Sequence, residues 1–176
     1  TVAVGLRAIC SGDFDNDGDV DIAVAGGISP GSVYILDNNG SAVFTPSAAI
    51  VVGNTPYDIQ TGDFDGDGDL DLASVNGGSA NVSILRNTAG AFTVTSSTPA
   101  GTLAHGLAVG DVDGDNDLDI AVANFSVNTA SILFNQTPST VFYYRSGDAG
   151  NPANWFNTPN PTGGIPATSF SSPATD

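Results

Sequence analysis

The sequence predicts an all-β protein built from three four-stranded blades of the propeller type, each about 50 residues long and each carrying a calcium-binding loop. Three observations lead to this prediction. A nine-residue acidic stretch occurs three times, at residues 13–21, 63–71 and 111–119. Short segments rich in β-branched and aromatic residues follow each stretch in the same order, separated by Gly, Asn and Pro turns. No segment shows the 3.6-residue periodicity of a helix.

Each repeat contains four candidate strands in a fixed order. The first is a short apolar segment before the acidic stretch, at residues 6–12, 57–62 and 106–110. The second begins DIAVAGG, DLASVNGG or DIAVANFS, and its small apolar residues suit an inner strand between neighbouring blades. The third contains SVYIL, NVSIL or ASILF, and the fourth contains AVFTPSA, AFTVTSS or VFYYRSG. The acidic loop is therefore expected to join the first and second strands of each blade.

The acidic stretch has the pattern D-x-D-x-D-[G/N]-D-[V/L]-D, with five carboxylates in nine positions. Two unit charges at ~4 Å repel each other by about 1 kcal/mol in bulk water and by about 4 kcal/mol at an effective dielectric of 20. Five crowded aspartates therefore resist folding unless a cation neutralises them. The alternative, an acidic solvated loop, is disfavoured because the same spacing recurs three times.

The expected ligands follow from the position of each residue in the loop. Side chains at positions 1, 3 and 5 converge when the backbone curls, and position 6 holds Gly18, Gly68 and Asn116, which tolerate a positive φ. The carbonyl of position 7 then faces the ion, and the carboxylate of position 9 closes the cage. The predicted metal residues are Asp13, Asp15, Asp17, Asp19, Asp21, Asp63, Asp65, Asp67, Asp69, Asp71, Asp111, Asp113, Asp115, Asp117 and Asp119, of which Asp19, Asp69 and Asp117 are expected to bind through the backbone carbonyl.

Six or seven oxygen ligands suit Ca²⁺ better than the strict octahedron of Mg²⁺, so three Ca²⁺ ions are expected. An EF-hand would require Glu at position 12, and the sequence contains no Glu. Three ions would change the formal charge from −16 to −16 + 6 = −10. The excess of acidic residues is thus explained mainly by the predicted metal sites. A chain with three Arg and no Lys is not expected to bind nucleic acid.

These loops and the segments around them resemble FG-GAP/VCBS repeats, the calcium-binding blades of integrin-α-like propellers. The resemblance lies in GDFDNDGDVDIAV (12–24), GDFDGDGDLDLAS (62–74) and GDVDGDNDLDIAV (110–122), in the third strands that follow, and in Phe44, Phe92 and Phe142. It covers residues 4–145. It implies side-chain ligands at positions 1, 3, 5 and 9 and a carbonyl ligand at position 7, in agreement with the argument above. The third loop departs from the family pattern with Asn116 where Gly is usual.

The predicted organisation is three blades over residues 1–145 and an extended C-terminal arm, or the start of a following segment, over residues 146–176. The arm is rich in Pro, Gly, Asn, Ser and Thr, and Trp155 and Phe156 are its expected anchors on a neighbouring subunit. Three blades do not close a propeller, which usually has ~4–8. The chain is therefore expected to form part of a larger propeller, or to associate with copies of itself as a homo-oligomer or polymer.

Few residues outside the loops could support catalysis. The remaining acids are Asp37, Asp58, Asp148 and Asp176, which fall in unrelated turns, and the sole histidine is His105. His105 aligns with Arg7 and Tyr57 of the other repeats, either as a ligand-facing rim or as ordinary exposed strand ends. Cys10, the one cysteine, is expected to be a small buried apolar residue rather than a nucleophile. The chain is therefore not expected to be an enzyme.

The expected function is that of an extracellular or cell-surface module, stabilised by calcium, that mediates adhesion or self-assembly. The expected partners are proteins or glycans at the cell surface, or copies of the chain. One alternative is a subunit of a self-assembling extracellular filament whose C-terminal arm docks on a neighbour. A weaker alternative is the non-catalytic propeller part of a secreted carbohydrate-active enzyme. No apolar run approaches the ~18 residues of a membrane span, so no membrane insertion is expected.

Overall fold

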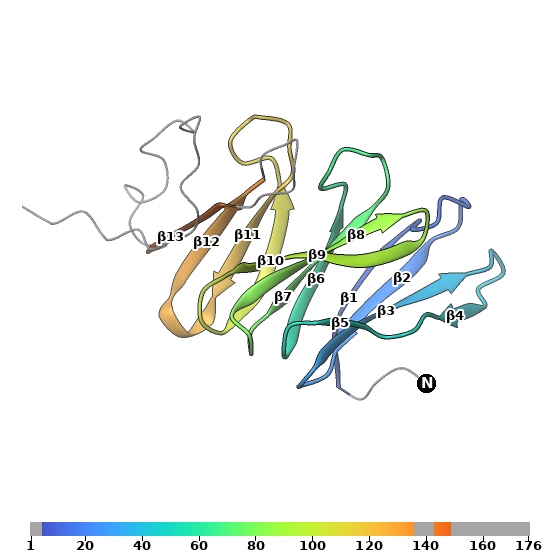
Figure 1. Cartoon of the computed structure of the whole chain (residues 1–176), viewed down its shortest axis with the longest axis horizontal. Coiled ribbons are helices and arrows are strands. Elements are labelled where there is room, and N and C mark those ends of the chain that lie inside the picture. The colour runs from blue at the N-terminus through green and yellow to red at the C-terminus, as the bar shows by residue number, and fades with distance from the viewer. Residues whose placement is uncertain (1–4, 136–142, 149–176) are drawn as a thin grey trace, which may run out of the picture.

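The computed structural model describes residues 5–135 and 143–148, which form three antiparallel β-sheets arranged side by side (Figure 1). The predicted all-β fold of repeated blades is confirmed. The only helical element among the described residues is a single 3-10 turn, η1 (Phe125–Val127). Blade 1 contains β1 to β5, blade 2 contains β6 to β9, and blade 3 contains β10 to β13.

Blade 2 shows the predicted arrangement in its simplest form. Its four strands pair in sequence order as an antiparallel meander, and the outer strand pairs along almost the whole length of the third. The Gly and Asn residues between the segments allow the tight turns that such a meander requires. The strands are β6 (Pro56–Gly62), β7 (Asp71–Asn76), β8 (Asn81–Thr88) and β9 (Ala91–Pro99).

Blade 1 differs because its outer strand is broken in two, which makes a five-stranded sheet instead of the predicted four. β4 pairs with the end of β3 at Leu36–Asn38, and β5 pairs with its beginning at Gly31–Val33. Ser47 bridges the break, because its N–H donates to Ile35 O (2.7 Å) and its hydroxyl accepts from Ile35 N (3.0 Å). Pro46 has no N–H, which favours the end of the strand there. The strands are β1 (Leu6–Gly12), β2 (Asp21–Gly26), β3 (Gly31–Asn38), β4 (Phe44–Pro46) and β5 (Ile50–Val52).

Blade 3 contains β10 (Ala104–Gly110), β11 (Asp119–Asn124), β12 (Thr129–Phe134) and β13 (Tyr143–Asp148). β13 pairs with β12 along its whole length, so the outer strand continues three residues into the segment predicted as an arm. The rest of that arm, with Trp155 and Phe156, and also Phe142, lie outside the described residues.

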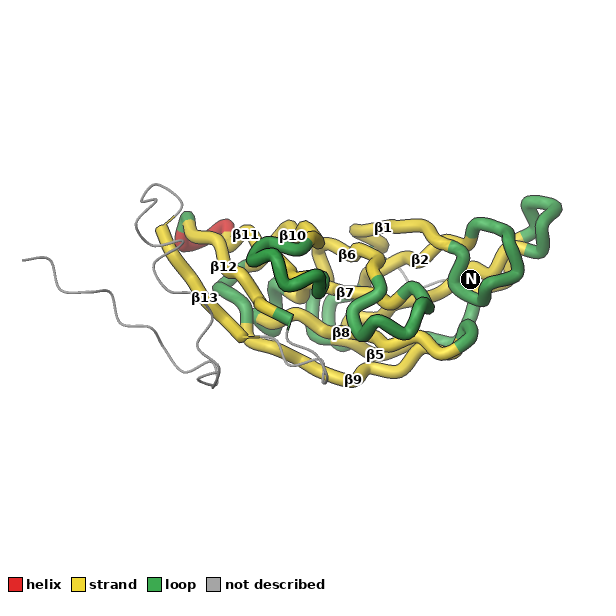
Figure 2. Tube along the Cα trace, turned by 90° about the horizontal axis from the view of Figure 1, so that it is seen from above, coloured by secondary structure: helices red, strands yellow, loops and turns green. Residues whose placement is uncertain are grey.

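The hydrophobic core lies between the blades rather than within any one of them. One buried cluster joins blades 1 and 2 and includes Phe14, Val33, Ile59 and Leu85. The other joins blades 2 and 3 in the same way. The first strands β1, β6 and β10 lie next to one another along one long edge of the array (Figure 2). Because each blade buries its apolar faces only against its neighbours, the array behaves as a repeat protein.

Candidate metal centres

The three acidic loops join the first strand of each blade to the second, as predicted, and they project from the same end of the array (Figure 1). Each loop connects two antiparallel strands, and the residue pair next to the loop is a Gly and an Asp. These pairs are Gly12 with Asp21, Gly62 with Asp71 and Gly110 with Asp119. The loops are therefore anchored at both ends by the sheet. Positions 1 to 9 below number the residues of each loop from its first aspartate.

The aspartate at position 1 organises the loop backbone. In the second loop, Asp63 accepts hydrogen bonds from Gly66 N (2.8 Å) and Gly68 N (3.0 Å), one on each carboxylate oxygen. Asp111 accepts from Gly114 N (2.7 Å) and Asn116 N (3.1 Å) in the same way. In the first loop, Asp13 accepts from Asp17 N (3.1 Å) and Gly18 N (3.0 Å). A carboxylate that accepts two N–H groups curls the chain around itself.

Two positions in each loop adopt the left-handed conformation. Position 6 was expected to do so, and φ is 94° at Gly18, 94° at Gly68 and 73° at Asn116. Position 4 does so as well, with φ of 63° at Asn16, 73° at Gly66 and 84° at Gly114. This second turn was not predicted from the sequence, although Asn and Gly at position 4 are the residues that such a turn favours. Two left-handed residues separated by one position give the loop its tight curl.

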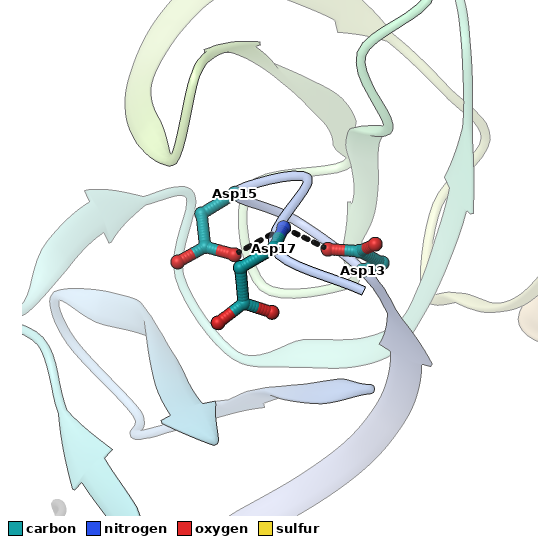
Figure 3. Close-up of side chains that lie close together, drawn as sticks. All are labelled: Asp13, Asp15 and Asp17. Carbon is teal, nitrogen blue, oxygen red and sulfur yellow. Dashed lines mark hydrogen bonds between the residues drawn. The ribbon is translucent and has the colours of Figure 1, made fainter. Parts of the chain in front are cut away.

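The curl brings three carboxylates together in each loop. Asp13, Asp15 and Asp17 point toward one another in the first loop (Figure 3), with one oxygen of each within 4.8 Å of the others. The corresponding triads are Asp63, Asp65 and Asp71 in the second loop and Asp111, Asp113 and Asp115 in the third. Oxygens bound at 2.3–2.6 Å to one Ca²⁺ lie at most about 5 Å apart, so each triad fits that ion.

The triads contain a subset of the predicted ligands. Positions 1 and 3 belong to the triad in all three loops, position 5 in the first and third, and position 9 in the second. Asp67, Asp21 and Asp119 therefore lie outside the triads. Their participation as fourth ligands stays a prediction, as does the carbonyl ligand at position 7.

The aspartate at position 9 is a buried link between the loop and the sheet. Asp71 accepts from Phe64 N (3.1 Å) at the start of its loop and from Asn87 N (2.7 Å) at the end of β8. Asp21 and Asp119 make the same two bonds in their blades, and all three residues are at most 1% exposed. Each carboxylate oxygen has two lone pairs, so one bond apiece leaves acceptor capacity for a cation. The residue expected to close the cage thus also holds the loop in place.

The side chain at position 7 contacts protein groups. Asp69 accepts from Asn16 Nδ2 of the first loop (2.7 Å) and from Ala89 N in the β8–β9 turn (2.9 Å). The Asp69 side chain thus ties neighbouring segments together, and the carbonyl ligand at this position stays a prediction. The bond from Asn16 also links loops of two different blades.

Burial opposes ionisation of these acids. It raises the pKa of Asp71 to about 6, although hydrogen bonds from Asn87 and Phe64 lower it and nearby carboxylates add to the rise. Burial likewise raises the pKa of Asp119 to about 6. Loss of hydration, followed by neighbouring carboxylates, also raises the pKa of Asp15 and Asp113 above its ordinary value. A bound divalent cation would favour the charged form of each of these groups.

The three loops differ in the residue that precedes the Asn at the end of the third strand. In blade 2 this residue is Arg86, whose guanidinium forms an ion pair with Asp65. In blade 1 it is Asp37, which lines a hollow beside the first loop together with Asp15 and Asp21. In blade 3 it is Phe134. The first loop therefore has an additional carboxylate near its ligands, and the second has a cation of its own.

Residues outside the loops offer little reactive chemistry. Cys10 is half-buried against the core between blades 1 and 2, and burial raises its pKa to about 12. A thiol that remains protonated is a poor nucleophile. Asp58 accepts from Ile59 N (2.9 Å) and Leu107 N (2.9 Å), so both of its oxygens bind backbone groups.

The aligned residues Arg7, Tyr57 and His105 form a stack across the three blades. Arg7 Cζ lies 5.0 Å from the centroid of the Tyr57 ring, Tyr57 and His105 centroids are 4.0 Å apart, and His105 stacks on Phe125 at 5.1 Å. Each of the three lies at a register shift in its first strand, and such bulges redirect side chains. The spacing of the repeats predicts that these three positions are equivalent, but it does not predict that their side chains touch.

Among residues 5–135 and 143–148, the structure contains no helix with the length and apolar character needed to span a bilayer.

Comparison with known proteins places the chain in a family. A search of curated proteins gives no match. The model of the FG-GAP-like repeat matches residues 13–74 and again residues 63–122, so the two matches overlap and together span the three acidic loops. The matched region covers more than half of the chain, and the fold consists of antiparallel blades with the acidic loop between first and second strands. The chain therefore belongs to the family of FG-GAP-like repeat proteins.

Proposed function

We propose that the chain is a calcium-stabilised, non-catalytic structural and recognition module that acts outside the cell and mediates adhesion or self-assembly. The observation that supports it best is the acidic loop, which is built three times with the same hydrogen bond from the backbone N–H of position 2 to a buried aspartate at position 9. A site so closely tied to the sheet suits a structural ion. Millimolar free Ca²⁺ is an extracellular condition, and sites with exposed ligands suit that range.

The ions are proposed to stabilise the fold, because each one would relieve repulsion among the crowded carboxylates of its loop. Of the two Arg residues in the range 5–135, only Arg86 is given an ion pair with a loop acid. Fifteen of the 19 acidic residues lie in the loops, so most of the negative charge of the protein lies where the ions would bind. Binding energy that is available only in the folded state adds directly to stability.

The proposal that the chain is not an enzyme is supported by the state of the few reactive side chains described. The Cys10 thiol is kept protonated by burial, both oxygens of Asp58 accept backbone N–H groups, and His105 is enclosed between two aromatic rings. Recognition by surface contacts therefore remains the proposed activity.

The filament alternative is favoured by apolar side chains that remain exposed on blade 1. Ile9 in β1 is 66% exposed, and Val20, which precedes β2, is 57% exposed. Exposed apolar surface of this kind often marks a site of protein association. The proposed docking of the C-terminal arm concerns residues outside the described ranges and stays a prediction.

The test is thermal denaturation of the chain with millimolar Ca²⁺, with millimolar Mg²⁺, and with excess chelator. We expect Ca²⁺ to raise the melting temperature strongly and Mg²⁺ to raise it less. Asp17→Ala should weaken binding in the first loop and leave two sites occupied, as counted by calcium titration. An unchanged melting temperature in excess chelator would show that the ions do not stabilise the fold.

A further inference from the structure

The two interfaces between blades are built from the same positions. At the first, Leu70 of blade 2 lies over Gly12 of blade 1, where an added Cβ would be 2.8 Å from Leu70 Cδ1. At the second, Leu118 lies over Gly62, and an added Cβ would be 2.9 Å from Leu118 Cδ1. The glycine before each loop thus forms a socket for the leucine at position 8 of the next blade's loop.

A hydrogen bond accompanies each socket. The side-chain amide of Asn87 donates to the carbonyl of Phe14 in the preceding blade (2.7 Å). The amide of Asn135 donates to the carbonyl of Phe64 in the same way (2.6 Å). Asn87 and Asn135 are at most 1% exposed, and so are the two phenylalanines. Every blade therefore has two different faces. The face toward the preceding blade, called the preceding face, presents a position-8 side chain and an Asn. The face toward the next blade, called the following face, presents a Gly and a position-2 carbonyl.

Blade 1 has a complete preceding face that remains open. Ile59 and Leu107, which fill this face in blades 2 and 3, are 0% and 8% exposed, whereas the equivalent Ile9 is 66% exposed. The position-8 residue is Val20, which is 57% exposed. Asn38, the equivalent of Asn87, donates to the carbonyl of Val20 in its own blade (3.1 Å), and the described residues give it no bond to another blade.

Blade 3 has a following face that is open in the complementary way. A Cβ added to Gly110 would meet no atom of the described residues within 4 Å, so none of these residues fills this socket. Val112 at position 2 is 43% exposed, whereas Phe14 and Phe64 are each 1% exposed. Ala123, whose counterparts Ala25 and Val75 are both fully buried, is exposed.

We infer that the open preceding face of blade 1 binds the open following face of blade 3 of a second copy of this chain. Val20 of one copy fills the Gly110 socket of the next, and the Asn38 amide donates to the Val112 carbonyl. The argument for a second copy as the occupant is complementarity: among the described residues, each of the two exposed faces carries one half of a fitting that the molecule makes twice. This inference deepens the proposed function and rests on it.

The contact is heterologous, because two different faces of the chain meet, so each added copy presents a new open face. The first and third loops of adjacent copies also come close together, as neighbouring loops do within the chain through Asn16 and Asp69. Ten aspartates of two loops would then lie near one another. Association therefore requires bound Ca²⁺.

The test measures particle mass by sedimentation velocity over a range of protein concentrations with millimolar Ca²⁺. Ile9→Asp disables the preceding face and Ala123→Asp disables the following face, and both residues are exposed in the single chain, so both variants should fold. Val94→Asp, at a 42% exposed position in the outer strand of the middle blade, is the matched control. We expect the unmodified chain and Val94→Asp to form multiples of the chain mass. Each face variant should associate on the order of tenfold more weakly or worse.

An equimolar mixture of the two face variants provides the decisive result. Ile9→Asp keeps an intact following face and Ala123→Asp keeps an intact preceding face, so the mixture should form a pair and nothing larger. A chain that gains thermal stability from Ca²⁺ but stays monomeric at every concentration would overturn the inference, leaving the face to a blade of another protein. Association unaffected by Ile9→Asp would also overturn it. Loss of calcium stabilisation, in contrast, would refute the proposed function itself.

Discussion

Asp71 shows how a single side chain serves both the loop and the sheet. Its two oxygens accept N–H groups from residues that are 7 and 16 positions away in the sequence, and it also belongs to the triad of the second loop. The spacing of the aspartates predicted a ligand at this position. It did not predict the two backbone bonds, because they depend on where β8 ends relative to the loop.

Replacing Asp71 with Asn should destabilise the protein even without metal. The amide nitrogen would face one of the two backbone donors, and a buried donor left without an acceptor costs about 1–3 kcal/mol. The free energy of unfolding should fall by about that amount when it is measured by urea denaturation in excess chelator at about pH 4. At that pH Asp71 is already protonated in the folded protein, so the substitution removes no charge. Asp67→Asn, at an exposed position of the same loop, is the control and should change it by less than about 0.5 kcal/mol. Equal losses for both variants would contradict a structural role for position 9.

The pH dependence of stability should have opposite signs with and without calcium. Burial raises the pKa of Asp71 and Asp119 to about 6, above the ordinary value of 3.8 in the unfolded chain. Between about pH 4 and 6 the folded metal-free protein therefore binds more protons than the unfolded one. The stabilisation from these protons is complete below about pH 4 and is lost as the pH rises through 6, on the order of 2 kcal/mol for each carboxyl.

With Ca²⁺ present, the ligands must lose their protons before they bind the ion, so stability should rise over the same pH range. Melting temperatures between pH 4 and 7, with calcium and with chelator, test both signs. Parallel curves in the two conditions would refute the assignment of these carboxylates to the sites.

At the scale of the strand and loop, the recurring bond from the third strand to the preceding loop holds the blades together. Asn87 connects blade 2 to blade 1 and also donates to the carbonyl of Leu70 in its own loop (3.1 Å). Asn38, Asn87 and Asn135 occupy equivalent positions in the three repeats, and the sequence does not distinguish their roles. Only the structure shows that two of them cross an interface and one does not.

Asn87→Ala should therefore cost more stability than Asn38→Ala. The first change removes the side-chain donor from the buried carbonyl of Phe14 and the partly buried carbonyl of Leu70, a loss of about 2–3 kcal/mol. The second removes one exposed bond worth about 1 kcal/mol. Urea denaturation in dilute calcium-loaded protein measures the difference. Similar losses for the two variants would mean that the bond between blades contributes little.

At the scale of the whole molecule, most of the acidic residues behind the net charge of −16 lie in the three loops at one end of the array. The three loops project from the same end, so their fields add instead of being spread over the surface. Without calcium, this repulsion should weaken the packing of blade against blade, because neighbouring loops contact each other through Asn16 and Asp69.

Monovalent salt should accordingly stabilise the metal-free protein. Screening shortens the Debye length from about 30 Å at 0.01 M salt to about 3 Å at 1 M, so the melting temperature in chelator should rise with NaCl over that range. The calcium-loaded protein has a formal charge nearer −10 and should respond less. A larger response with calcium than without it would contradict this account.

The sequence by itself determined the repeat, the strand order, the place of the acidic loops and the family, since each depends on local chemistry repeated at a fixed spacing. The tertiary structure decided what depends on neighbours in space. It showed the broken outer strand of blade 1, which Ser47 bridges, and the double role of the aspartate at position 9. It also showed that the equivalent residues Ile9, Ile59 and Leu107 differ in exposure, because burial depends on whether a blade lies against them and not on the residue itself.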